Sequence, residues 1–398
     1  MLSRQIRSLK SSPTLALAAK AKSLKSQGHD VISLTVGEPD WPTYDKAKQA
    51  GIQAIKDNKT TYTPASGISE LRIAIAQLTA TQLGCDVQEQ HVSVASGAKF
   101  VIFSALNAIL DPGDEVIIPS PYWVSYPTMV ELAHGVPKLI TCGFEQEFKL
   151  TAMQLQSAIT SKTKALLLNS PSNPTGAEYS REELKSLAKV LDANPNIAVI
   201  SDDIYNQLSF NEQGLSPHIL NVAPHLFDRC ISINGVSKAY SMTGWRIGWA
   251  VGPQEVIKAM GSYQSQTTGA PCSISQWASV AAIKGCYDEV VKSLVFLKER
   301  KQLFTQLLED IPGLVPFSPQ GAFYLWVGLP DWLGKSYRGE ILRDSRQVAE
   351  KLLEDQKLAV VPGLEFGLEA YLRFSFAASE EDLKRAAQRL VQFHSELS

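Results

Sequence analysis

The sequence predicts an α/β fold in which helices sandwich a large, mostly parallel sheet and a smaller α+β domain follows. Three observations predict it. Short strand-like runs alternate with helical segments, several of these runs are apolar throughout, and the alternation stops near residue 275. Strands alternating with helices indicate βαβ units, and strands that are apolar throughout are typical of a sheet covered on both faces.

Seven strands are predicted in the first part of the chain. They cover residues 92–95, 115–119, 138–141, 165–169, 198–202, 230–234 and 248–252. Helices are predicted between many of them, for example over 100–110, which a turn at 111–114 ends, and over 181–192. This alternation predicts an open α/β sheet.

The last third of the chain predicts a different, α+β unit. In order, it contains a helical region over 276–310 with a break near Gly285, a strand over 321–327, a helix over 345–356, strands over 358–361 and 371–375, and a helix over 380–395. We therefore expect a large domain over 46–285 and a small one over 286–398. Residues 1–45 are expected to pack with the small domain.

The composition is that of an ordinary globular chain. Its 398 residues are 44% hydrophobic and 20% charged, with a net charge of −2. At about 150 residues per domain, this length predicts two to three domains. The small net charge gives no reason to expect nucleic acid or an acidic membrane as a partner. No apolar run approaches the ~18–20 residues needed to span a bilayer.

The N-terminus and the cysteines bear on location. No acidic residue precedes Asp30, which fits either a transit peptide or a solvated segment leading into a helix over 13–27. Pro13 and Gly28 favour the helix, as a start and a stop signal. The five cysteines contain no C-x-x-C pair, so a reducing cytoplasm is the expected location. The six histidines show no metal-binding spacing, and no metal site is expected.

Chemically useful side chains follow five of the predicted strands. They are Gly97-Ala98-Lys99, Trp123, Asn173, Asp202 with Tyr205, and Ser237-Lys238. Each alone means little, since a lone loop lysine is usually solvated. Ligands of open α/β sheets bind beyond the carboxyl ends of the strands, however, so these side chains are expected to share one site.

This combination suits pyridoxal 5'-phosphate (PLP). A lysine amine can form a Schiff base with an aldehyde cofactor, and an aromatic side chain can stack on a pyridine ring. A carboxylate beside the ring nitrogen keeps it protonated, so that the ring accepts electrons. Backbone N–H groups at a helix N-terminus, together with an arginine, suit its phosphate.

Residues 235–248, GVSKAYSMTGWRIG, resemble the lysine-attachment signature of class I PLP-dependent aminotransferases of fold type I. The eight-residue step from Lys238 to Arg246 matches that family. Supporting blocks extend the resemblance over nearly the whole chain: GEPD (37–40), TYTPASGISEL (61–71), DPGDEV (111–116), PYWVSYP (121–127), NSPSNPTG (169–176), SDDIY (201–205) and YLRFS (371–375). The bacterial aspartate aminotransferase subgroup is the most similar.

The resemblance implies roles for individual residues. Lys238 would form the Schiff base and later move the proton between the substrate Cα and the cofactor C4'. Asp202 would pair with the pyridinium, and Tyr205 and Asn173 would meet the cofactor O3'. The remaining cofactor contacts would be Trp123 against the ring, Gly97, Ala98, Ser237 and Arg246 at the phosphate, and Tyr62 from a second subunit of a homodimer.

The resemblance also implies how the substrate binds. Arg373 would grip its α-carboxylate, with Asn173 and Trp123 nearby, and Gly37 would belong to a loop that closes over the site. Lys99 and Thr14 would meet the side-chain carboxylate of an aspartate substrate. The implied reaction moves an amino group between an L-amino acid, most simply aspartate, and 2-oxoglutarate by a ping-pong mechanism.

One departure and several alternatives remain. Many relatives carry a serine three residues before the lysine, where this chain has Gly235, so one hydroxyl donor to the phosphate is missing. An aminotransferase for aromatic amino acids or prephenate, or a PLP-dependent C–S β-lyase, would share most of these residues. A transcription regulator that borrowed the fold would need an added DNA-binding region. The chain lacks the glycine-rich motifs of nicotinamide and P-loop enzymes.

Overall fold

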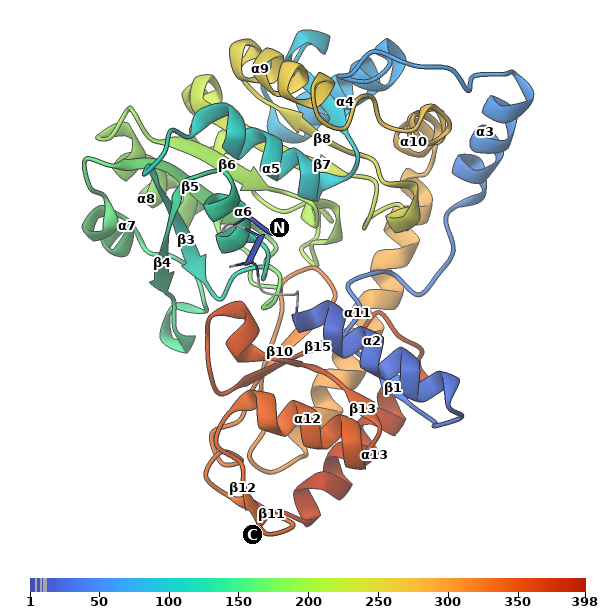
Figure 1. Ribbon diagram of the computed structural model, residues 1–398, viewed down its shortest axis with the longest axis vertical. Helices are drawn as coiled ribbons and strands as arrows, with labels where there is room; N and C mark the ends of the chain where they lie inside the picture. The colour runs from blue at the N-terminus through green and yellow to red at the C-terminus, as the bar shows by residue number, and fades with distance from the viewer. Residues whose placement is uncertain (4–5, 8, 10–12) are drawn as a thin grey trace.

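A seven-stranded sheet forms the centre of the larger part of the molecule in the computed structural model, which describes residues 1–3, 6–7, 9 and 13–398 (Figure 1). Its order is β2-β8-β7-β6-β5-β3-β4. Only β8 runs antiparallel to its neighbours, so the predicted mostly parallel sheet is confirmed. The strands are β2 (Val92–Ala95), β3 (Glu115–Ser120), β4 (Val136–Thr141), β5 (Thr163–Asn169), β6 (Ala198–Asp202), β7 (Cys230–Gly235) and β8 (Gly248–Val251).

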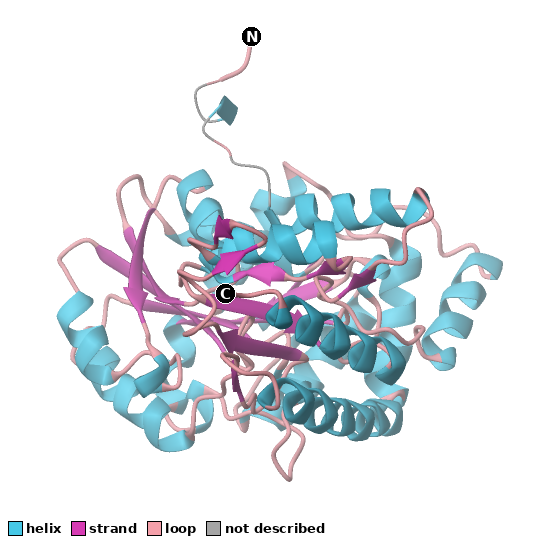
Figure 2. Cartoon of the chain, turned by 90° about the horizontal axis from the view of Figure 1, so that it is seen from below, coloured by secondary structure: helices cyan, strands magenta, loops and turns pink. Residues whose placement is uncertain are grey.

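Helices cover both faces of this sheet (Figure 2). Along β5, Leu166 and Leu168 pack into one apolar cluster with α8, whereas Ala165 and Leu167 pack into another with α5. Both faces of the strand are therefore buried, which explains its apolar run. The helices of this part are α3 (Asp45–Lys56), α4 (Ser69–Leu83), α5 (Ala98–Ile109), α6 (Tyr126–Leu132), α7 (Ala152–Ala158), α8 (Arg181–Asp192), α9 (Gln254–Ser265) and α10 (Ser273–Gly285).

Helix α8 spans its predicted residues because strong local signals agree there. The Ser180 hydroxyl accepts a hydrogen bond from the Glu183 backbone N–H at 3.2 Å, and the Glu183 carboxylate accepts one from the Ser180 N–H at 2.7 Å. This reciprocal capping satisfies two N–H groups that the first turn leaves free. Leu184, Leu187 and Leu191 lie at helical spacing and are buried against the sheet.

A second, antiparallel sheet of order β14-β15-β10-β9 forms the centre of the smaller part. Its strands are β9 (Val315–Phe317), β10 (Tyr324–Gly328), β14 (Val361–Pro362) and β15 (Tyr371–Ser375), and its helices are α11 (Tyr287–Glu309), α12 (Ser345–Asp355) and α13 (Glu380–Ser395). Helix α11 connects the two parts in Figure 1. The predicted helix break near Gly285 separates α10 from α11.

Two predicted strands of this part differ from the observed ones. The strand expected from Gly321 begins only at Tyr324, because Ala322 has a φ of 58°, which a strand cannot accommodate. The strand expected over 358–361 is two short strands, β13 (Leu358–Ala359) and β14, because the two segments pair with different partners. A small hairpin, β11 (Ser336–Tyr337) and β12 (Glu340–Ile341), was not predicted.

The N-terminal segment packs against the C-terminal part. Helix α2 (Pro13–Ser26) lies beside α12 and β13 in Figure 1. Strand β1 (Ile32–Ser33) pairs in parallel with β13. Ala21, Val31 and Leu353 share one buried cluster, and Lys20 forms a 3.0 Å ion pair with Glu354. These contacts support our division into 1–45, 46–285 and 286–398, whose boundaries stay a proposal.

Membrane-spanning helices and metal-binding clusters, neither of which is expected from the sequence, can be looked for in the described residues only. None of the helices there combines the length and the apolar character needed to cross a membrane. The same residues contain no group of three or more His, Cys, Asp or Glu side chains arranged to hold a metal ion.

Candidate active site

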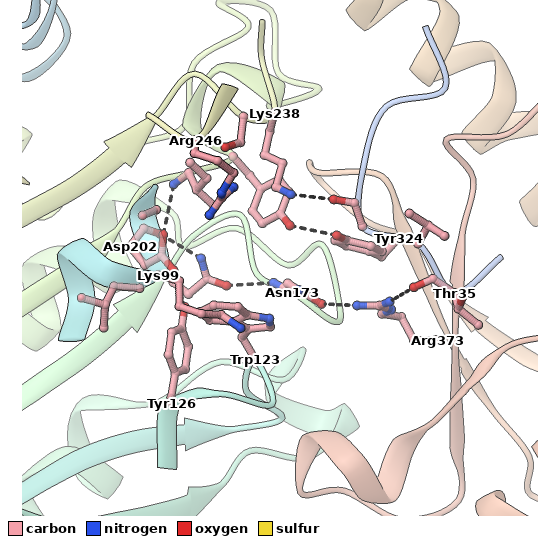
Figure 3. Close-up of a pocket in the computed structure, with 18 residues that line it drawn as sticks. Thr35, Lys99, Trp123, Tyr126, Asn173, Asp202, Lys238, Arg246, Tyr324 and Arg373 are labelled. Carbon is pink, nitrogen blue, oxygen red and sulfur yellow. Dashed lines mark hydrogen bonds between the residues drawn. The ribbon is translucent and has the colours of Figure 1, made fainter. Parts of the chain in front are cut away.

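A cavity of about 330 Å³ lies at the carboxyl ends of the large sheet's parallel strands and is shared with the small sheet (Figure 3). Among the described residues, four cationic side chains line it, Lys99, Lys238, Arg246 and Arg373, against the single carboxylate of Asp202. This excess of positive charge suits a ligand or ligand pair that carries several negative charges.

Lys238 follows β7 and is buried in this cavity. Its Nζ donates a hydrogen bond to the Gly37 carbonyl at 2.5 Å. Burial lowers its pKa to about 8, with Arg246 and Arg373 acting in the same direction and Glu38 and Asp202 opposing them. At pH 7 about a tenth of such amines are uncharged, far more than for an ordinary lysine. An uncharged amine is the form that attacks a carbonyl.

Asp202 is the last residue of β6 and is held from two sides. The Tyr126 hydroxyl donates to its Oδ2 at 2.6 Å, and the Ile204 backbone N–H donates to its Oδ1 at 3.3 Å. Burial raises its pKa to about 6; the neighbouring Asp203 adds to the rise, while the Tyr126 hydrogen bond opposes it. The carboxyl is therefore mostly ionised at neutral pH and can accept a hydrogen bond from a protonated ring nitrogen.

Arg373, on β15, faces the cavity from the small sheet. Its Nη1 donates to Asn173 Oδ1 at 2.9 Å, and its Nη2 donates to the Thr35 carbonyl at 2.6 Å. Its Nε is buried, and no described residue offers it a hydrogen-bond acceptor. Because buried donors are normally paired, this guanidinium still has capacity for an anion. Asn173 accepts through its oxygen, which leaves its Nδ2 to donate to a ligand.

The N-terminus of α5 and Arg246 form a cradle of donors. Ala98 begins the helix and lines the cavity, and Gly97 caps it with a φ of 91°. A Cβ on Gly97 would collide with the Arg246 guanidinium, so only glycine lets the two approach this closely. Gly97 itself is not among the residues that line the cavity. A helix N-terminus with a guanidinium beside it is a site for phosphate.

Aromatic side chains line the cavity in two places. Trp123 packs edge-to-face on Tyr126 with ring centroids 5.4 Å apart. Lys99 Nζ lies 4.9 Å from the centre of the Trp123 ring, and burial, helped by Arg246, lowers the pKa of Lys99. The Tyr205 hydroxyl lies 2.8 Å from that of Tyr324.

The structure thus brings eleven of the predicted residues to one cavity: Gly37, Ala98, Lys99, Trp123, Asn173, Asp202, Tyr205, Ser237, Lys238, Arg246 and Arg373. Tyr62 does not line it and is fully exposed. Thr14 lies in α2, but its side chain is outside the described part of the structure. Gly235 does not line the cavity either. A Cβ there would lie 2.8 Å from the Ile247 carbonyl, which explains glycine at this position.

The chain matches the family model described as aminotransferase class I and II over residues 29–390. The chain belongs to this family. The aspartate/prephenate aminotransferase of Cereibacter sphaeroides is 43% identical over 398 residues, which cover all of this aminotransferase and 99% of the relative. The family and fold predicted from the sequence are therefore confirmed.

Solved structures agree closely with this aminotransferase. The aspartate aminotransferase of Rhizobium meliloti superposes with a TM-score of 0.96 at 42% identity and covers 100% of both chains. The aspartate aminotransferase of Thermus thermophilus with maleate superposes with a TM-score of 0.92 at 40% identity and 99% coverage of each. The enzyme is thus similar to aspartate aminotransferases along its whole length.

Sequence reasoning missed several residues of this aminotransferase's cavity, notably Thr35, Tyr126, Asn169 and Tyr324. Tyr126 and Asn169 lie within blocks that signalled the family, so their positions could have been singled out. Thr35 and Tyr324 come from segments that only the tertiary structure brings to the sheet edge.

Proposed function

We propose that this enzyme uses PLP to transfer an amino group from L-aspartate to 2-oxoglutarate by a ping-pong mechanism. The observation that carries the proposal is the cavity's four cations against one carboxylate, with the buried Lys238 amine among them. PLP carries a phosphate, and both substrates carry two carboxylates. The unpaired Nε of Arg373 and the glycine-enabled approach of Arg246 to α5 fit such anions.

The residues present fit PLP at each of its polar groups. Arg246, Ser237 and the N–H groups at the start of α5 would hold the phosphate, and Trp123 would stack on the ring. Asp202 would hold the proton on the ring nitrogen, with Tyr126 fixing its orientation. Tyr205 and Asn173 would donate to the phenolic oxygen. When bound, PLP supplies an aldehyde that condenses with amines and a ring that accepts electrons from the substrate.

The chain's own residues would then carry the proton chemistry. Lys238 would hold the cofactor covalently until the substrate amine displaces it. Its freed Nζ, already uncharged more often than an ordinary lysine, would take the proton from the substrate Cα and deliver it to the cofactor C4'. Arg373 and Asn173 would fix the α-carboxylate, so that the Cα–H bond faces Lys238.

Aspartate is favoured by Lys99, a cation of the cavity wall in addition to those assigned to phosphate and α-carboxylate. Thr14 is proposed beside it. The Rhizobium and Thermus neighbours are named aspartate aminotransferases. A second candidate amino acceptor is prephenate, because the Cereibacter relative is named for aspartate and prephenate. One site could serve both, since each presents a second carboxylate.

We further propose a homodimer with shared sites and a cytoplasmic location. Tyr62, which the family resemblance assigns to the cofactor of a second subunit, is fully exposed and therefore accessible to such a partner. The five cysteines are all free, which is typical of a reducing compartment.

The deciding experiment is a panel of amino donors assayed with 2-oxoglutarate, comparing aspartate, tyrosine and alanine, with prephenate as alternative acceptor. We expect aspartate to give the highest kcat/KM, and Lys238→Ala to bind PLP while its transamination falls to background. Pyruvate release from cysteine-type donors without an oxo acid would instead indicate a C–S β-lyase. Near-normal turnover by Lys238→Ala would mean that another amine does the chemistry.

A further inference from the structure

We propose that Tyr324 is a positioning residue that couples the substrate-carboxylate arginine, Arg373, to the orientation of the Tyr205 hydroxyl. Tyr324 lies on β10 of the small sheet and is completely buried in the cavity wall. In Figure 3 it lies between Lys238 and Arg373. The inference rests on the proposed function, because it assigns Tyr205 to the cofactor and Arg373 to the substrate.

The first contact is between two hydroxyl groups. Tyr324 Oη and Tyr205 Oη lie 2.8 Å apart, and burial raises the pKa of both phenols, so both keep their protons at neutral pH. Only one of the two protons can occupy the bond between them. If Tyr324 donates, Tyr205 accepts and its own proton is free to point toward a ligand. Tyr324 thereby makes Tyr205 a donor to an oxygen in the cavity.

The second contact is between the Tyr324 ring and Arg373. The guanidinium carbon lies 4.4 Å from the centre of the ring, within the range of a cation–π interaction. Phe366 lies 5.0 Å from the same carbon. Because β10 and β15 are paired neighbours, this stacking is built into the sheet. It orients the plane of the guanidinium, and a planar fork must be oriented to grip a carboxylate with two bonds.

The third contact is with the backbone of Gly37. A Cβ at that position would lie 2.7 Å from Tyr324 Oη, so the hydroxyl leaves no room for any side chain there. The Gly37 carbonyl also accepts the Lys238 hydrogen bond. One side chain thus touches three segments that meet only in the folded protein, and it links the carboxylate clamp to the cofactor side.

The test separates the hydroxyl of Tyr324 from its ring. Tyr324→Phe keeps the ring and removes the proton that orients Tyr205. In the PLP-bound enzyme, we expect the pH midpoint of the visible absorbance change to rise by at least ~0.3 unit. The reason is that a weaker hydrogen bond from Tyr205 stabilises the ionised phenolic oxygen of the cofactor less. The KM for aspartate should stay within about twofold, because the cation–π contact persists.

Tyr324→Leu removes the ring as well. We expect the KM for aspartate, and the dissociation constant of maleate as a non-reacting dicarboxylate probe, to rise about five- to thirtyfold, the equivalent of one cation–π contact. The matched control is Tyr371→Phe. Tyr371 lies on the neighbouring strand β15 and stacks on Trp326 outside the cavity, so its variant should change neither readout.

A rescue experiment checks the same geometry through the stability of the fold as well as through activity. Gly37→Ala should lower the melting temperature and the activity, because its Cβ meets the Tyr324 hydroxyl. The double variant Gly37→Ala, Tyr324→Phe should recover part of both, since the nearest ring carbon is 3.8 Å away.

The outcomes distinguish this inference from the proposed function. If wild-type enzyme binds PLP and transaminates aspartate, but both Tyr324 variants behave like Tyr371→Phe, the coupling is wrong. If wild-type enzyme does not act on aspartate, the proposed function fails, whereas the absorbance shift of Tyr324→Phe still supports the link to Tyr205. If Tyr324→Phe and Tyr324→Leu raised the KM for aspartate and shifted the pH midpoint by equal amounts, Tyr324 would act only through packing.

Discussion

Burial tunes the two titratable groups at the centre of the cavity in opposite directions. It lowers the pKa of Lys238 to about 8 and raises that of Asp202 to about 6. Each shift brings the group closer to neutral pH, where the amine can react and the carboxyl can still accept a proton. The chemistry of the site thus depends on how deeply these side chains lie.

The lowered pKa of Lys238 predicts how PLP attachment depends on pH. In cofactor-free protein the attachment rate should rise with pH and reach its half-maximum near 8, because only the uncharged amine attacks the aldehyde. Rapid-mixing absorbance measurements would follow it. Glu38→Gln is the control: the Glu38 carboxylate raises the Lys238 pKa, so its removal should move the profile to lower pH. A wild-type midpoint near that of ordinary lysine, about 10.4, would contradict the assignment.

The raised pKa of Asp202 predicts that the ionised carboxyl lowers the free energy of unfolding, although the proposed reaction needs this carboxyl. Its folded-state pKa, about 6, exceeds its ordinary value of 3.8, so the folded state holds the proton longer than the unfolded state. This group therefore makes the free energy of unfolding fall as pH rises through that interval.

Asp202→Asn removes this penalty. Cofactor-free Asp202→Asn should be more stable than wild type by about 3 kcal/mol at pH 7, and the difference should vanish below about pH 4. Transamination by the variant should be nearly abolished. Urea unfolding at several pH values measures the first effect; a variant less stable than wild type at pH 7 would refute it.

At the scale of single elements, local capping and strand pairing decide where each segment begins and ends. Helix α8 has a reciprocal cap and an apolar stripe, and its predicted ends match the observed ones. The segment over 358–362, by contrast, is divided between two different partner strands, β1 near the N-terminus and the nearby β15. Such pairing depends on tertiary contacts that no local pattern encodes.

The cap of α8 can be tested without touching the active site. Ser180→Ala removes the hydroxyl that accepts the Glu183 N–H and should lower the free energy of unfolding by about 1 kcal/mol, with kcat unchanged. Ser186→Ala, on the same helix beyond its first turn, is the control and should be nearly neutral. Equal effects of the two variants would rule out a special role for the cap.

At the scale of the whole molecule, the net charge of −2 hides a strongly cationic cavity. Segments from both parts of the chain supply its cations, and Arg373 comes from the small sheet. The same scale includes the proposed homodimer, since Tyr62 lies fully exposed on one chain.

We expect the purified enzyme to sediment as a dimer and Tyr62→Phe to release PLP more readily. Loss of one hydroxyl hydrogen bond should raise the PLP dissociation constant about two- to tenfold, with secondary structure unchanged. Tyr287→Phe, at another exposed tyrosine, serves as the control. A monomer that retains full activity would exclude the shared site.

The amino-acid sequence was enough to predict the seven strands of the large sheet, the family and most of the cavity. Lys238, Asp202, Asn173 and Trp123 follow buried strands, and the carboxyl ends of parallel strands must meet at one edge. Capping residues and apolar runs are local signals, so β6, α8 and α13 were predicted with their observed ends. These features depend on neighbours along the chain.

Which distant side chains meet, and how burial shifts their pKa values, depends on the folded structure and not on local sequence. Tyr324 reaches Tyr205 and Arg373 because the small sheet lies against the edge of the large one, and Gly37 joins them from the N-terminal segment. The lowered pKa of Lys238 likewise follows from burial among groups far away in sequence. Desolvation and packing are properties of the assembled interior, and a linear pattern of residues does not encode them.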